Sequence, residues 1–141
     1  MSMAGYGIGK AKIMTVALDH TIVAAKDRWQ SARFLADILG LAAGPEWARF
    51  VPVRTGNGVT LDFVDSPDVR SRHFAFLISE AEFDASLARI KAAGVAYHAE
   101  HDGSDPGEIN RHYGGRGVYF KGPEGHLFEI ITRPYGAVPE G

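Results

Sequence analysis

Hydrophobic and polar positions along the chain follow the spacing of strands in some segments and of helices in others. The same order of strand-like and helix-like segments occurs twice. In residues 16–23, apolar side chains fall on every second position, which is typical of a strand. The segment after Asp27 has apolar residues at helical spacing as far as Gly40, so we expect a helix with Asp27 as N-cap and Gly40 as its end. Turn residues divide residues 41–64, where we expect two or three short strands.

The same scheme restarts at Ser71. Residues 71–78 predict a strand, and residues 80–93 predict a helix that ends at Gly94. Ser79 and Glu82 have the spacing of a capping box at the start of this helix. A short strand is expected at residues 95–99. A hairpin is expected at residues 117–132.

The hairpin contains an unusual acid. Pro123 suits the first corner of its turn and Gly125 suits a positive φ. The second strand, residues 126–132, surrounds Glu129 with apolar residues on both faces. A carboxylate among such neighbours costs several kcal/mol unless it is compensated, and a bound cation is one compensator. The alternative is an edge strand with Glu129 in water.

The two halves form an internal repeat of strand, helix and three strands, at residues 16–65 and 70–133. The first strand of each half carries a histidine, His20 or His73. The last strand carries an acid, Asp62 or Glu129. We therefore expect an α+β fold in one domain, residues 14–135, with a flexible tail at residues 1–13 and a second tail at 136–141.

Composition limits the possible functions. A net charge of −2 gives no basic field for nucleic acid. No apolar run is long enough to span a bilayer and the N-terminus lacks a signal-peptide pattern, so we expect neither a membrane partner nor export from the cytoplasm. The chain has no cysteine, so any metal must be held by His, Asp or Glu.

The repeat resembles the vicinal oxygen chelate superfamily, which groups glyoxalase I, extradiol dioxygenases, fosfomycin-resistance thiol transferases and bleomycin-resistance proteins. The resemblance covers residues 16–135. It rests on four segments in order: LDHTIV, the helix end ILGL, HFAFLISEAEFDASLARIKAAGV and GGRGVYFKGPEGHLFEIIT. It implies that two βαβββ modules pair into a cupped, incomplete mixed β-barrel with helices outside and metal ligands on first and last strands.

The resemblance implies a divalent metal held by His20, His73 and Glu129. Two imidazoles and a carboxylate suit Fe²⁺, Mn²⁺, Ni²⁺ or Zn²⁺ and leave positions for substrate. Asp62 is a possible fourth ligand, where glyoxalase I has a glutamate one methylene longer. The intact trio argues against the bleomycin-binding branch, whose members lack these ligands.

Other residues are candidates for contacts with substrate. Tyr119 lies where related enzymes place a catalytic hydrogen-bond donor, although it could instead fill the barrel. Arg111 and Arg116 could clamp an anionic group, or be solvated or paired with local acids. His112 could bind substrate as an acid or base on a lid formed by residues 100–115, or be a simple loop histidine.

No branch of the family fits completely. Extradiol dioxygenases require a histidine between the two ligand histidines, and this chain has none between His20 and His73. The segment INRHYGGRG lacks the serine and lysine of fosfomycin enzymes. The resemblance implies a metal-dependent enzyme for a small oxygenated substrate, dioxygenase-like or lyase/isomerase-like. The apolar interior favours an aromatic substrate. The alternative is a non-catalytic binding protein of the bleomycin-resistance type. The resemblance also implies a homodimer whose barrels combine modules of two chains.

Overall fold

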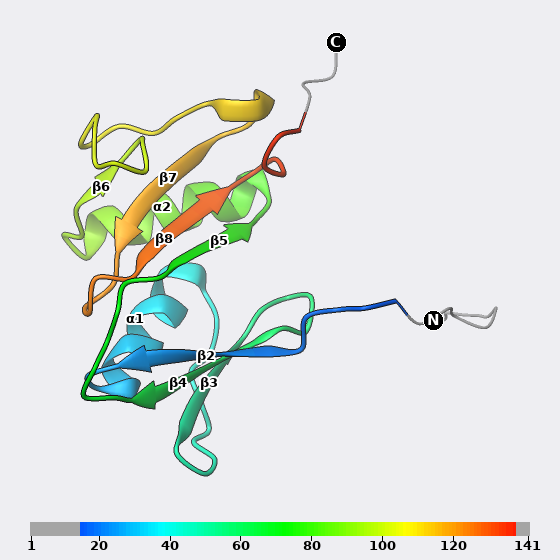
Figure 1. Cartoon of the computed structure of the whole chain (residues 1–141). Coiled ribbons are helices and arrows are strands. Elements are labelled where there is room, and N and C mark those ends of the chain that lie inside the picture. The colour runs from blue at the N-terminus through cyan, green and yellow to red at the C-terminus, as the bar shows by residue number, and fades with distance from the viewer. Residues whose placement is uncertain (1–14, 138–141) are drawn as a thin grey trace.

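The computed structural model describes residues 15–137, which form two sheets and two long helices (Figure 1). The predicted tail at residues 1–13 lies outside the described residues. The elements are β2 (His20–Ala25), α1 (Arg28–Leu39), β3 (Phe50–Arg54), β4 (Thr60–Asp65), β5 (His73–Leu77), α2 (Glu80–Ala92), β6 (Tyr97–His98), the 3₁₀ turn η1 (His112–Gly114), β7 (Gly117–Lys121) and β8 (Leu127–Ile131). The α+β fold of two modules is confirmed. The first strand begins later than the alternation predicted.

The helix ends follow the sequence signals. The Asp27 side chain accepts hydrogen bonds from the first-turn N–H groups of α1, and Gly40 ends this helix with φ of 72°. Ser79 and Glu82 form the predicted capping box of α2. None of the helices in residues 15–137 is long and apolar enough to cross a membrane.

The two sheets share one topology over three strands, and the second sheet has β6 as a fourth strand. The first has the order β2-β4-β3 and the second β5-β8-β7-β6. In each sheet the first strand of the module is parallel to the last, and the preceding strand is antiparallel to that last strand. Within residues 15–137, β2 and β5 are therefore edge strands, and the two sheets do not join into a closed barrel (Figure 1).

The strand register is also repeated. His20 pairs with Thr60 and Ile22 pairs with Asp62 in the first sheet. His73 pairs with Leu127 and Ala75 pairs with Glu129 in the second. In each sheet the acid thus lies two residues after the strand partner of the histidine. The acid and the histidine therefore lie on the same face of the sheet. Because β8 lies between β5 and β7, the edge-strand alternative for Glu129 is wrong.

The opposite face of each sheet packs against the helices, and contacts between the modules continue this core. The rings of Phe34 on α1 and Phe120 on β7 have centroids 6.1 Å apart. The Arg89 guanidinium donates to the carbonyl of Ile38 at 3.2 Å. Buried His126 donates from Nε2 to the carbonyl of Ala24 at 2.8 Å. These contacts hold the modules together and leave the other sheet faces open.

Candidate metal centre

Glu129 lies at the centre of the second sheet. Its residue is only 3% exposed, and its Oε1 is 3.0 Å from Nε2 of His73. Tyr119 is directly opposite Glu129 in the strand register, and its hydroxyl donates a hydrogen bond to this carboxylate. The second sheet therefore brings together three of the predicted site residues.

Tyr119 is held as a protonated donor. Burial raises the pKa of its hydroxyl, and the nearby charge of Glu129 raises it further. The ring is parallel to that of His98, at a centroid distance of 5.9 Å, and lies 5.9 Å from the ring of His73. Tyr119 therefore packs between two histidines and presents its O–H group to the carboxylate, while its catalytic role stays a prediction.

His20 and Asp62 lie on the first sheet. His20 is exposed, with Nδ1 2.8 Å from Oδ2 of Asp19, and this hydrogen bond raises the pKa of the imidazole. Asp62 is only 4% exposed, and its Oδ1 has no hydrogen-bond partner. Within residues 15–137, no three His, Asp or Glu side chains gather closely enough to hold a metal ion. One chain thus brings His73 to Glu129 but does not bring His20 to them.

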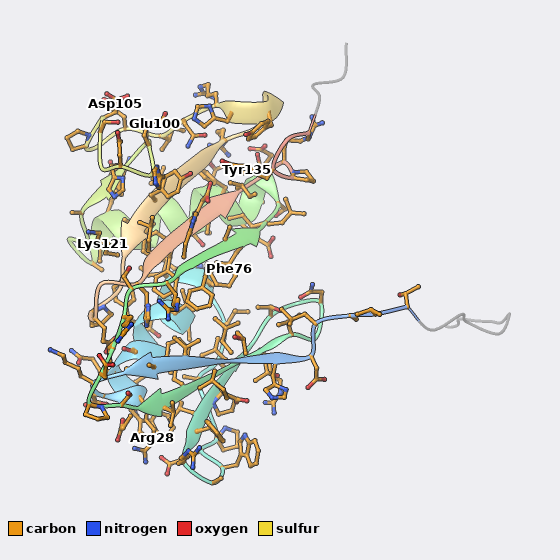
Figure 2. The ribbon with its side chains drawn as sticks, in the orientation of Figure 1. Arg28, Phe76, Glu100, Asp105, Lys121 and Tyr135 are labelled. Carbon is orange, nitrogen blue, oxygen red and sulfur yellow. The ribbon has the colours of Figure 1, made fainter. Side chains whose placement is uncertain are left out.

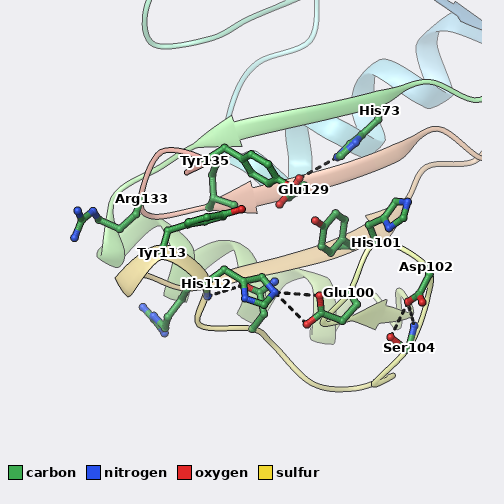
Figure 3. A pocket seen from close by; sticks show the side chains of 14 residues that line it. His73, Glu100, His101, Asp102, Ser104, His112, Tyr113, Glu129, Arg133 and Tyr135 are labelled. Atoms are coloured by element: carbon green, nitrogen blue, oxygen red, sulfur yellow. Dashed lines mark hydrogen bonds and ion pairs between the residues drawn. The ribbon is translucent and has the colours of Figure 1, made fainter. Parts of the chain in front are cut away.

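A cavity of about 600 Å³ opens beside His73 and Glu129 (Figure 3). Its walls come from β5, β7 and β8, from the long segment at residues 100–116, and from the segment after β8. In Figure 2, Glu100 and Asp105 lie in the loops beside β6 and β7, and Tyr135 lies in the segment after β8. The predicted lid segment therefore forms one wall of this cavity.

The predicted substrate-binding residues lie in different surroundings. Arg116 lines the cavity, but its guanidinium bonds to Glu80 at 2.7 Å and Asp84 at 2.9 Å on α2. Arg111 is exposed and is not part of the cavity wall. His112 lines the cavity, with Nε2 close to the carboxylate of Glu100. The charge of Arg116 is thus already paired, and His112 is the other of these three residues that lines the cavity.

Glu100, Tyr113 and Tyr135 are among the cavity-wall residues that sequence reasoning missed. The rings of Tyr113 and Tyr135 have centroids 5.0 Å apart, and their hydrogen bond raises the pKa of Tyr113. The segment that carries Glu100 and Tyr113 has no hydrophobic periodicity, so no pattern placed it. His101, His112 and Tyr113 are the residues of this segment that could have signalled a site.

Comparisons with known proteins agree with this architecture. The model of the Glyoxalase/Bleomycin resistance protein/Dioxygenase superfamily matches residues 17–130. The structure of Oxidase ChaP-H2 is 54% identical, with a TM-score of 0.86, over 88% of this chain and 98% of that one. Oxidase ChaP-H1 is 51% identical, with a TM-score of 0.85, over 87% and 100%.

A more distant match is Glutathione transferase FosA from Serratia marcescens, 23% identical over 124 residues, which are 83% of this chain and 81% of that protein. The family match extends from the strand of His20 to that of Glu129, and so includes both modules and all four candidate ligands. The chain therefore belongs to the Glyoxalase/Bleomycin resistance protein/Dioxygenase superfamily.

Proposed function

We propose that the protein is a metal-dependent enzyme that oxidises a small oxygenated, aromatic substrate. The observation that carries this proposal is the buried carboxylate of Glu129, bonded to His73 at the wall of a cavity large enough for a small molecule. Burying an ionised carboxylate is costly, and a metal ion is an effective compensator. The proposed metal ligands His73 and Glu129 therefore lie at the wall of the cavity in which we propose that the substrate binds.

The donor set fits a divalent metal. His20 and His73 offer imidazole nitrogens, and Asp62 and Glu129 offer carboxylate oxygens, a combination suited to Fe²⁺, Mn²⁺, Ni²⁺ or Zn²⁺. The unpartnered Oδ1 of buried Asp62 supports a cation at this position, because such an atom otherwise lacks compensation. A divalent ion bound there would supply Lewis-acid chemistry to a substrate oxygen.

We propose that two chains share each site. His20 lies on the exposed edge strand β2, while His73 lies on β5, the edge of the other sheet. Apolar Leu18, Ile22 and Leu77 are exposed on or beside these edges. A second copy that pairs its first module with this second module would cover these side chains and add His20 and Asp62 to His73 and Glu129.

An oxidation fits better than thiol transfer to a phosphonate. Two solved relatives that are at least half identical are named oxidases. FosA is named a glutathione transferase, and its identity to this chain is only 23%. The cavity wall also gives little support for binding a phosphonate, because Arg116 is paired with Glu80 and Asp84. Tyr119 would act beside the metal as a hydrogen-bond donor. Its hydroxyl stays protonated and donates to an oxygen of the substrate or of Glu129.

Metal analysis of the purified protein tests the proposal. Wild-type protein should contain Fe, Mn, Ni or Zn in stoichiometric amount, and His73→Ala should lose it. His98→Ala is the matched control, because His98 lies on the same sheet but bonds to the Glu100 carbonyl rather than to Glu129. Oxygen consumption with a panel of catechols and hydroquinones would then separate oxidation from isomerisation. Wild-type protein that takes up no metal under any loading would support the binding-protein alternative.

Mixing two defective variants tests the shared site. His20→Ala and His73→Ala should each bind no metal tightly. If each site uses His20 of one chain and His73 of its partner, equal mixing with subunit exchange should restore about one quarter of the sites. If one chain supplied both histidines, mixing would restore none.

A further inference from the structure

Across the cavity from His73 and Glu129 lies a second pair that the proposed metal site does not use. Nε2 of His112 is 3.0 and 3.1 Å from the two carboxylate oxygens of Glu100. Both side chains line the cavity, and Figure 3 places them opposite the His73–Glu129 pair. An imidazole beside a carboxylate, both facing a substrate cavity, is an arrangement suited to proton transfer.

The contact with Glu100 fixes which nitrogen of His112 carries the proton. An ionised carboxylate can only accept hydrogen bonds, so Nε2 must be the protonated nitrogen in the neutral ring. Nδ1 is then left with a lone pair. The His112 side chain is 51% exposed, so this lone pair has access to the cavity and its contents.

The backbone around the pair is held by one buried residue. The Asn110 side chain is 7% exposed, donates from Nδ2 to the carbonyl of Ala99 at 2.7 Å, and accepts the backbone N–H of His112 at Oδ1 at 3.2 Å. Asn110 therefore joins the residue before Glu100 to the backbone of His112. Gly117 leaves room for this amide, since a Cβ there would lie 2.9 Å from Asn110 Oδ1.

The residue after His112 has a strained backbone. Tyr113 has φ of 58° and ψ of 25°, a left-handed conformation that costs a non-glycine residue roughly 1 kcal/mol. The turn is retained because Gly115 N–H bonds to the His112 carbonyl at 3.0 Å and Tyr113 bonds to Tyr135. Strain maintained by several contacts is typical of a segment that positions a functional group.

We propose that His112 accepts the proton of a substrate hydroxyl at Nδ1, and that Glu100 is the positioning residue that orients its ring. The substrate O–H bond breaks, its electron pair stays on the oxygen, and the proton forms the N–H bond of an imidazolium held by Glu100. The proton can return to the product by the reverse step. This inference rests on the proposed function, because the hydroxyl belongs to the substrate of the same site.

The probe for this step is 4-nitrocatechol, whose ionisation changes its absorbance. Zn²⁺-loaded protein should be used, because Zn²⁺ has no redox chemistry and the colour then reports ionisation alone. After rapid mixing at slightly acidic pH, His112→Gln should slow ionisation of the probe about 100-fold. Glu100→Gln should slow it about 10-fold, because a half-exposed carboxylate orients a ring less firmly than a buried one. Affinity for the probe should change little.

Controls separate chemistry from structure. Glu108→Gln removes an exposed acid of the same loop outside the cavity wall and should react at the wild-type rate. Glu100→Asp should recover part of the rate lost in Glu100→Gln. Added imidazole should restore ionisation in His112→Ala, which no structural role would explain. A His112→Gln variant that ionises the probe as fast as wild-type protein overturns the proposal.

Nitrogen-15 shifts of histidine in the metal-free protein give a readout independent of activity. His112 should be protonated at Nε2, and a ring protonated at Nδ1 overturns the orienting role of Glu100. Failure of the proposed function has another signature: wild-type protein would bind neither Zn²⁺ nor the probe. That result would overturn proton acceptance from a substrate, whatever the tautomer of His112.

Discussion

The two modules share one backbone frame but differ in how they treat the acid of their last strand. Glu129 accepts hydrogen bonds from His73 and from Tyr119. Asp62 holds the equivalent register position, yet its Oδ1 has no partner, and His20 bonds to Asp19 instead. The repeat therefore preserves the position of the acid in the sheet, while the hydrogen-bond partners of that acid differ between the modules.

Side-chain chemistry explains the difference. The residue opposite Glu129 is Tyr119, which has a hydroxyl donor, whereas the residue opposite Asp62 is Pro52, which has no side-chain donor. Asp62 is also one methylene shorter than Glu129. The second module completes its own hydrogen bonds, while the first leaves an acid that still needs a partner. In the proposed shared site, the first module would contribute its ligands upon assembly of two chains.

The largest expected effect follows replacement of Asp62. Asp62→Asn should lower metal affinity by about 100-fold if Asp62 is a ligand. The same variant should unfold less readily without metal, by about 1 kcal/mol, because burying a neutral amide costs less than burying a carboxylate. Competition with a chelating dye and urea unfolding measure the two quantities. Asp68→Asn, at an exposed acid after β4, is the control. Unchanged metal affinity in Asp62→Asn would exclude it as a ligand.

The two histidines should differ in their effect on the metal-free fold. His73→Ala removes a partner of buried Glu129 and should cost about 2 kcal/mol of unfolding free energy. His20→Ala removes an exposed side chain bonded only to exposed Asp19 and should leave the urea midpoint unchanged. Equal losses in the two variants would contradict the difference between the modules.

Replacement of Tyr119 should lower the free energy of unfolding by less than replacement of His73. Tyr119→Phe keeps the ring between His73 and His98 but removes the donor to Glu129, and should cost about 1 kcal/mol in urea unfolding. In the double variant with Glu129→Leu, loss of the hydroxyl should cost less than in Tyr119→Phe alone. A cost that stays the same would mean that the hydroxyl acts through another partner.

The smallest effect concerns the helix starts, which also differ. α1 begins with Arg28, which bonds to Asp65, while α2 begins with Glu80, which bonds to Arg116. A hydrogen bond from Thr132 lowers the pKa of Glu80 below 4.5, and Arg116 lowers it further. Because the folded pKa is lowered, this stabilisation is present at neutral pH and disappears as the pH falls through the folded value.

Glu80→Gln should therefore have a lower urea midpoint than wild-type protein at pH 7, and the difference should vanish at an acidic pH below the lowered pKa of Glu80. A difference of the same size at both pH values would show that hydrogen bonding alone, without the charge of Glu80, is responsible.

The periodic parts of the chain could be predicted from its sequence. Capping by Asp27 and Ser79, the turn at Gly125 and the burial of Glu129 all follow local rules that the structure obeys. The edge-strand alternative for Glu129 was open because one strand alone does not reveal its neighbours in a sheet.

The cavity wall could not be predicted in the same way. Glu100 meets His112 only because Asn110 joins two parts of an aperiodic segment, and the partners of Arg116 lie on a helix more than thirty residues earlier. Such contacts depend on tertiary geometry, which hydrophobic period does not encode. The relation of His20 to His73 was also open, because sequence cannot distinguish contacts within a chain from contacts between chains.

Among the described residues, β2 and β5 lie at sheet edges, and this has a consequence for handling the protein. An open strand edge flanked by exposed apolar side chains can recruit any extended peptide, including a misaligned copy of itself. If two chains share each site as proposed, a newly made chain is at greatest risk of precipitation before it pairs with a second copy. Dilution, which protects many proteins, should be harmful here, and supplying metal early should improve the soluble yield.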